Sequence, residues 1–140
     1  MDYLRAYAIS GSGMAVEKAR VDVTAANLAN ANSTRSAGGA LYQPLRLITG
    51  AAAPDFAGQL AGALRGAEVI GVRPVDAPPR LSYEPGHPDA DDKGFVSYPG
   101  IQPLAEMMIM ITAVRAYEAN VAALNAAKAM AMKTLDIGGN

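Results

Sequence analysis

The chain has 140 residues, of which 51% are hydrophobic and 18% charged, with a formal net charge of −1. This balance gives no electrostatic footprint for nucleic acid or anionic lipid, and it excludes the composition of an intrinsically disordered acidic chain. There is no Cys and only one His, which excludes disulfides, thiol chemistry, zinc fingers and His-cluster metal sites.

The positions of proline divide the chain into three parts. All nine Pro residues fall between Pro44 and Pro103, so both ends permit helices and the middle does not. Alanine accounts for 29 residues and Phe for only two, a composition that suits closely packed helices better than a bulky aromatic core. We expect a mainly α protein in which residues 1–34 and 104–140 are paired terminal helices and residues 35–103 are a Pro/Gly-rich, β-rich insert.

The N-terminal part has two apolar rows at helical spacing. A second, shorter row (Ile9, Val16 and Val23) lies about 150° around the helix from the main one, at 100° per residue. A helix that is apolar on two sides requires neighbours on both flanks. Gly11 and Gly13 interrupt the pattern and predict a close helix approach or a kink. The main row, spaced by three and four, is Leu4, Tyr7, Gly11, Met14, Lys18, Val21, Ala25 and Leu28.

The middle of the chain has short runs typical of strands. These runs are Leu41–Ile48, Glu68–Val72 and Arg80–Tyr83, and Gly and Pro clusters separate them. A Gly/Ala-rich stretch, Ala51–Gly66, carries few strand-forming residues. We expect a small insert able to hold two hairpins.

The C-terminal part predicts a helix over about 103–136. Pro103 suits the first helical turn, and Gly138-Gly139 supply a stop. An a/d row extends over about four heptads, and we expect it to pair with the N-terminal row as an antiparallel coiled coil. Two such helices bury too little to be stable alone, so packing against other subunits is expected. The row is Met107, Met110, Val114, Tyr117, Val121, Leu124, Lys128, Ala131 and Leu135.

Neither a membrane span nor a secretory signal is expected. No stretch approaches 18 continuous apolar residues, and the start of the chain lacks a basic region followed by an apolar one.

One loop carries the residue types of a metal or acid/base site. His87 precedes Asp89, Asp91 and Asp92, and the spacing from Asp89 partly resembles a calcium loop. However, Lys93 and Gly100 stand where a calcium loop requires an oxygen ligand and Glu. A small hydrolase that uses these groups stays open as an alternative, but a solvated turn is the simpler interpretation. We therefore expect no catalytic, metal-binding or cofactor-binding residues and no enzyme activity.

Three segments resemble a known family. Residues 22–34 (DVTAANLANANST) resemble the N-terminal signature of bacterial flagellar rod, hook and hook–filament junction proteins. Residues 113–120 (AVRAYEAN), followed by Lys128, Met130, Lys133, Thr134 and Leu135, resemble the C-terminal signature of the same axial family. The middle segment, residues 83–96 (YEPGHPDADDKGFV), resembles that of proximal-rod members.

The resemblance implies a structural subunit of the flagellar basal-body rod, which transmits torque for motility. It implies no cofactor, no nucleic acid, and partners that are other rod proteins and copies of the chain itself. It also implies export by the flagellar type III apparatus without a cleaved signal, and a place in the rod within the periplasmic space. The residues expected at subunit interfaces are Asn27, Leu28, Asn30, Thr34, Met107, Met110, Val114, Arg115, Tyr117, Glu118, Asn120, Val121, Leu124 and Leu135.

A different class of function also fits the heptads. A soluble helical-hairpin module, binding or chaperone-like, would use the same rows and form a stable small oligomer.

Overall fold

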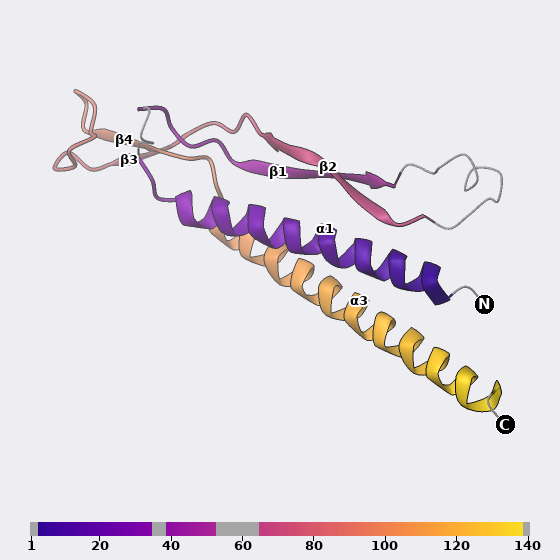
Figure 1. The fold of residues 1–140 in the computed structure, drawn as a ribbon. Helices are drawn as coiled ribbons and strands as arrows, with labels where there is room; N and C mark the ends of the chain where they lie inside the picture. The colour runs from indigo at the N-terminus through magenta and orange to yellow at the C-terminus, as the bar shows by residue number, and fades with distance from the viewer. Residues whose placement is uncertain (1–2, 35–38, 53–64, 139–140) are drawn as a thin grey trace.

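The computed structural model describes residues 3–34, 39–52 and 65–138. Within these ranges the chain is mainly helical, with two helices and two small antiparallel strand pairs (Figure 1). In chain order the elements are α1 (Tyr3–Asn30), β1 (Leu45–Ala51), β2 (Ala67–Pro74), β3 (Arg80–Tyr83), β4 (Phe95–Tyr98) and α3 (Pro103–Gly138).

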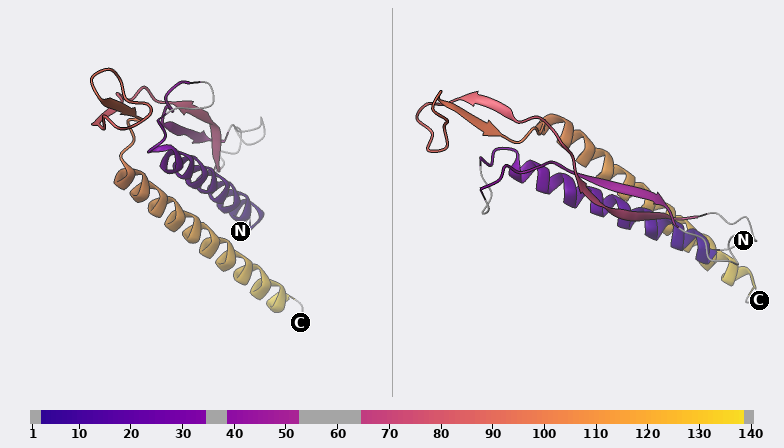
Figure 2. Two further views of the ribbon diagram at one scale, coloured as in Figure 1. Left: turned by 90° about the vertical axis from the view of Figure 1, so that its left-hand side faces the viewer. Right: turned by 90° about the horizontal axis from the view of Figure 1, so that it is seen from above.

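The two helices lie side by side and run in opposite directions (Figures 1 and 2). α3 begins at Pro103, where the missing N–H costs nothing, and Glu106 in its first turn complements the helix dipole. The helix predicted over about 103–136 is therefore confirmed. α1 continues to Asn30, where the run of Asn, Ser and Thr begins that competes for backbone hydrogen bonds.

The first strand pair covers one flank of α1. β1 and β2 pair from Leu45↔Pro74 to Ala51↔Ala67, with an irregularity between Ile48 and Thr49, and the hairpin lies along the helix (Figure 1). The two predicted runs overlap these strands. The chain's own hairpin thus supplies the neighbour that the second apolar row of α1 required. Most of the predicted Gly/Ala-rich stretch, residues 53–64, lies outside the described residues.

The second strand pair projects beyond the ends of the helices (Figure 2, right). β3 and β4 pair from Arg80↔Tyr98 to Tyr83↔Phe95. β3 has the bounds that the sequence predicted, whereas β4 was not predicted. At the junction with α3, a Cβ on Gly100 would collide with the backbone oxygen of Pro78, so the two linkers cross where only glycine fits.

The contact between the two helices is made by small residues and lies beside the predicted row. Met107, Val114 and Tyr117 are 50%, 40% and 39% exposed, whereas Ala113 and Ala127 are buried. The prediction that the Met107–Leu135 row forms the seam between the helices is therefore wrong for these residues. From Glu106 to Asn120 the buried row is rotated by one residue, or about 100°, and farther along it shares Leu124 and Ala131 with the predicted row. This row of buried and half-buried positions is Glu106, Ile109, Ala113, Ala116, Asn120, Leu124, Ala127 and Ala131.

α3 is more apolar than the lack of a stretch of 18 continuous apolar residues indicated. By length and composition alone, Pro103–Asp136 could cross a membrane, since an 18-residue window within it has a mean hydropathy of 1.2 and only 6% of that window is buried. The absence of a long uninterrupted apolar run therefore did not exclude such a helix. The core of soluble proteins contains similar helices, but there they are mostly buried.

Candidate functional site

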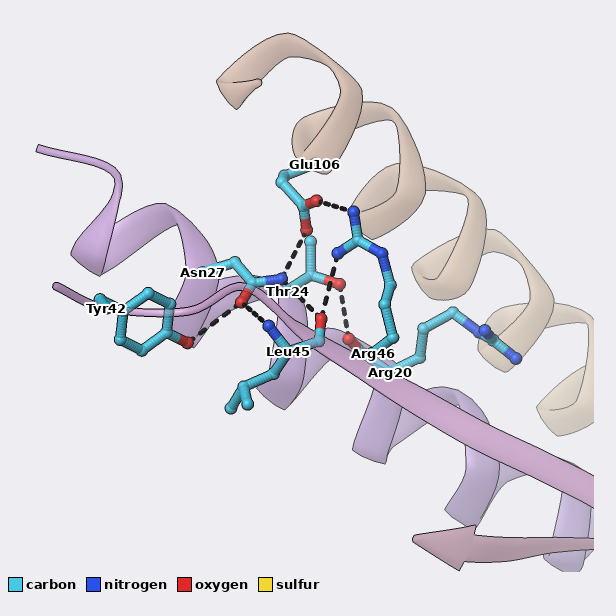
Figure 3. Close-up of polar contacts among 7 residues, drawn as sticks. All are labelled: Arg20, Thr24, Asn27, Tyr42, Leu45, Arg46 and Glu106. Carbon is cyan, nitrogen blue, oxygen red and sulfur yellow. Dashed lines mark hydrogen bonds and ion pairs between the residues drawn. The ribbon is translucent and has the colours of Figure 1, made fainter. Parts of the chain in front are cut away.

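Asn27 joins three parts of the chain. Its side chain is fully buried, and its Nδ2 donates to the Leu45 carbonyl oxygen at 2.9 Å and to Glu106 Oε2 at 3.0 Å. Its Oδ1 accepts hydrogen bonds from the Leu45 N–H at 2.8 Å and from the Tyr42 hydroxyl at 3.0 Å. Figure 3 shows the amide between the chain at Leu45 and the first turn of α3. All four hydrogen-bonding positions of the carboxamide are used within the chain.

An ion pair between a buried carboxylate and a half-exposed arginine completes this cluster. Glu106 is 2% exposed, and its Oε1 lies 2.7 Å from Nη2 of Arg46, whose side chain is half exposed. Arg46 also donates from Nη1 to the Leu45 carbonyl oxygen at 3.1 Å (Figure 3). Because a buried carboxylate is costly unless it is paired and hydrogen-bonded, these partners tie the start of β1 to the first turn of α3 through side chains.

The negative charge of the Glu106 carboxylate also acts on Tyr42. Burial, and secondarily the Glu106 carboxylate, raise the pKa of Tyr42 above its ordinary value of 10.0. The phenol therefore stays protonated and continues to donate to Asn27. We call Asn27, Tyr42, Arg46 and Glu106 the anchor cluster.

The rest of the N-terminal signature has local or loop contacts. Asn30 donates from Nδ2 to the Ala26 carbonyl oxygen at 2.8 Å, one turn earlier. The Thr34 hydroxyl donates to Asp89 Oδ2 at 2.7 Å, which ties the end of α1 to the loop between β3 and β4. Leu28 is half-buried. These hydrogen bonds, like those of Asn27, lie within one chain.

The C-terminal signature includes the closest approach of the two helices. A Cβ on Gly13 would lie 2.8 Å from Oδ1 of Asn120, so α1 and α3 meet where α1 has no side chain. Asn120 is held by its own donation to the Ala116 carbonyl oxygen at 2.9 Å. The close approach predicted from glycine is confirmed at Gly13, whereas a Cβ at Gly11 would meet nothing within 4 Å in the part of the chain that the structure describes.

Much of α3 points away from the rest of the chain. Arg115 and Glu118 pair with each other at 2.9 Å while both stay exposed, an arrangement that contributes little stability. Of the other predicted interface residues on α3, Met110, Val121 and Leu124 are half-buried. The large exposed apolar side chains of this helix are Leu104, Met107, Met108, Ile111, Val114, Tyr117, Met130, Met132 and Leu135.

Grooves follow the line where the two helices meet. A groove of about 260 Å³ is lined by Lys18 and Val21 of α1 and by Val114 and Tyr117 of α3. All four belong to the two predicted apolar rows, which therefore flank one groove instead of meeting face to face. Another groove, of about 430 Å³, is lined by Glu17, Arg20, Met108, Ile109, Thr112 and Ala116.

The acidic loop forms an ordered turn. Asp91 Oδ1 accepts hydrogen bonds from the N–H groups of Lys93 at 2.9 Å and Phe95 at 2.8 Å. His87 Nδ1 accepts from the Asp89 N–H at 3.1 Å, and Gly94 takes a positive φ of 82° to close the turn. Among the described residues no group of three or more acidic or His side chains could hold a metal ion.

Sequence reasoning missed three members of the anchor cluster. Glu106 resembles an ordinary acidic residue in a first helical turn, and Arg46 and Tyr42 lie in an extended run with no motif. Their partners are 60 and 15 positions away along the chain, and only the fold brings them together.

Comparison with known proteins gives one consistent result. Residues 8–36 match the family described as "Flagella basal body rod protein", and residues 92–137 match "Flagellar basal body rod FlgEFG protein C-terminal". Relatives from several bacteria carry the name "Flagellar basal-body rod protein FlgC". The protein of Yersinia enterocolitica is 38% identical over 138 residues, with 99% of both chains covered. That of Salmonella typhimurium is 39% identical over 139 residues, again covering 99% of each chain, and that of Bacillus subtilis is 34% identical with 93% and 94% covered.

Proposed function

Because the chain belongs to the flagellar basal-body rod protein family, it is a structural subunit of the rod and not an enzyme, and we propose that the exposed apolar surface of α3 is its interface with neighbouring rod subunits. The observation that carries this proposal is the exposure of α3. A helix that is apolar all round is stable in water only when other surfaces cover it, and this chain leaves most of that surface bare.

The predicted interface residues fit this proposal in two groups. Met107, Val114, Tyr117 and Leu135 lie on the exposed surface and are available to a neighbour. Asn27 instead acts within the chain, where the anchor cluster fixes the hairpin β1–β2 against the helix pair. The neighbours we propose are copies of this chain and other rod proteins.

The contact between α1 and α3 supports antiparallel coiled-coil packing. The buried row of α3 follows spacings of three and four, and half of its members are Ala. Small residues along the seam bring the two backbones close together, as at Gly13. The larger apolar side chains are then left for contacts between subunits.

Protein neighbours, and not lipid, are proposed to cover α3. Asn120, Asn125 and Lys128 interrupt its second half, and the Arg115–Glu118 pair lies midway along it. Charged groups within a membrane span are costly. The proposed route is export through the flagellar type III apparatus without a cleaved signal, to a rod in the periplasmic space. The relatives described above support the rod and give no support to a soluble helical-hairpin module.

The test introduces one charge at each of two equally exposed isoleucines. Ile111 on α3 is 62% exposed and Ile70 on β2 is 64% exposed. Ile111→Asp should lower the amount of this chain in purified hook–basal bodies at least tenfold, measured by quantitative mass spectrometry. Ile70→Asp should leave the amount within twofold of the unmodified chain. Equal incorporation of the two variants would contradict the proposed interface.

A further inference from the structure

The two ends of the elongated molecule differ in shape. Asn27 faces Glu106, and Gly13 faces Asn120. Moving 14 residues toward the start of α1 therefore corresponds to moving 14 residues toward the end of α3. Tyr3 is therefore level with Met130, and α3 extends past it by about 12 Å at 1.5 Å per residue. At the opposite end, the hairpin β3–β4 projects beyond the helices (Figure 2).

Both ends expose apolar side chains that the described part of the chain leaves uncovered. Strand alternation places Val96 and Tyr98 inward, where they are buried, and leaves Leu81, Tyr83 and Phe95 outward. The Tyr83 and Phe95 rings pack edge to face with centroids 5.3 Å apart. On the extending end of α3, Leu135 is 71% exposed and Met132 is also exposed.

The two ends also carry opposite charge. The loop between β3 and β4, residues 84–94, contains four acidic residues and one lysine. At the other end, α3 from Lys128 to Asp136 contains two lysines and one aspartate, with Lys128 just before the level of Tyr3. Exposed ion pairs contribute little affinity, but complementary charge favours one orientation of approach. The apolar contact supplies the affinity and the charges select the end that binds.

We propose that the outer face of the β3–β4 hairpin docks on the extending end of α3 in a second copy of this chain. The contact uses two different surfaces, so it is heterologous and leaves a free surface at each end of the pair for the next copy. This end-to-end contact takes Met132 and Leu135 from the apolar surface of α3 and leaves the stretch from Leu104 to Tyr117 for the proposed interface along the helix.

Cysteine cross-linking tests the contact directly, since the chain contains no Cys. Leu81 and Leu135 are 63% and 71% exposed, so replacing them should leave the fold intact. They lie at opposite ends of the molecule, so a Leu81→Cys, Leu135→Cys chain can form this disulfide only between copies. Hook–basal bodies from cells that make this variant should contain disulfide-linked multimers of the chain, which a reductant converts to monomers. A second pair, Tyr83→Cys with Met132→Cys, repeats the test with different side chains.

A matched pair controls for chance collision. Leu81→Cys with Ala15→Cys, where Ala15 is exposed midway along α1, should give no multimers. The proposal is overturned if both end pairs give no more multimer than this control, or if the thiols introduced on β3 join only to a different basal-body protein. Those outcomes leave the interface along α3 intact, because incorporation of the chain is counted separately in the same samples.

Charge reversal provides a readout that needs no cysteine. Asp92→Lys and Lys133→Asp should each lower incorporation severalfold when every copy carries the change. When cells make both single variants together, the reversed ends match each other, and incorporation should return to within twofold of normal. Failure to recover would count against pairing between copies.

Discussion

The carboxamide nitrogen of Asn27 lies 3.0 Å from Oε2 of Glu106, a carboxylate that is 79 positions later in the chain. This bond joins α1 to the first turn of α3 at the point where the insert returns to the helix pair. The same amide also holds both backbone groups of Leu45. One buried side chain therefore positions both helices and the first hairpin.

Replacing Asn27 with Ala should lower the free energy of unfolding by about 3 kcal/mol or more, because it leaves a buried carboxylate and two backbone groups short of partners. Urea unfolding of the purified chain, followed by circular dichroism, measures the change. Asn30→Ala is the matched control, since Asn30 is half-buried and, among the described residues, its side chain bonds only within its own helical turn and to Ser33. The control should change stability by only about 0.5 kcal/mol, and equal losses in the two variants would contradict the role of Asn27.

The two glycines of α1 should respond differently to alanine. Gly11→Ala should stabilise the chain by about 1 kcal/mol, the difference in helix propensity, because no atom of the described residues lies within 4 Å of the added methyl group. Gly13→Ala gains the same propensity but displaces Asn120 from its hydrogen bond to Ala116. Its stability should therefore be lower than that of Gly11→Ala by about 1 kcal/mol or more.

A double-mutant cycle assigns that difference to one contact. In a chain that already carries Asn120→Ala, the two glycine substitutions should give equal stabilities, measured by thermal unfolding. A difference that persists without the Asn120 side chain would show that some other neighbour of Gly13 is responsible.

Tyr42 should make stability depend on alkaline pH. Burial and the nearby Glu106 carboxylate raise the pKa of Tyr42 above 10.0, so above pH 10 the unfolded chain loses this proton before the folded chain does. Its contribution is therefore complete below pH 10 and is lost as the pH rises through the folded pKa. Tyr42→Phe removes this component and costs about 1 kcal/mol at pH 8, through the lost hydrogen bond to Asn27.

Urea unfolding at pH 8 and at pH 11 checks both parts of that prediction. Between the two pH values, the Tyr42→Phe chain should lose less stability than the unmodified chain. The Tyr42→Phe chain will still lose some stability at alkaline pH, because burial and Glu84 also raise the pKa of Tyr98. If the two chains lose the same amount of stability between pH 8 and pH 11, the pKa of Tyr42 is not raised by folding, and the prediction is wrong.

The sequence was sufficient to predict both helices and three of the strands, because these elements have strong local signals. Pro103 marks the start of α3, and no proline interrupts either helix. β4 is only four residues long and lies between Gly94 and Pro99, so its tendency to form a strand depends on pairing with β3, which no local pattern contains.

The rotation of the seam has a different cause. Apolar side chains lie on all sides of α3. The predicted row contains the largest of them, so it identifies the surface that most needs to be covered. That surface differs from the one that α1 covers. Within the chain, Ala113 and Ala127 make the close contact, and their small side chains contribute little to a hydrophobic pattern. The anchor cluster was unpredictable because its residues come together only after both helices and β1 have folded.

The exposed methionines of α3 allow the most direct test of the interface along this helix. Met107, Met108, Met130 and Met132 are all exposed in the single chain, and brief hydroxyl-radical oxidation followed by mass spectrometry measures each thioether. In hook–basal bodies, covering by neighbouring subunits should lower the oxidation rates of Met107 and Met108 at least fivefold relative to the purified chain. Equal rates in the rod and in the free chain would contradict the account, because α3 would then stay bare in the assembled rod.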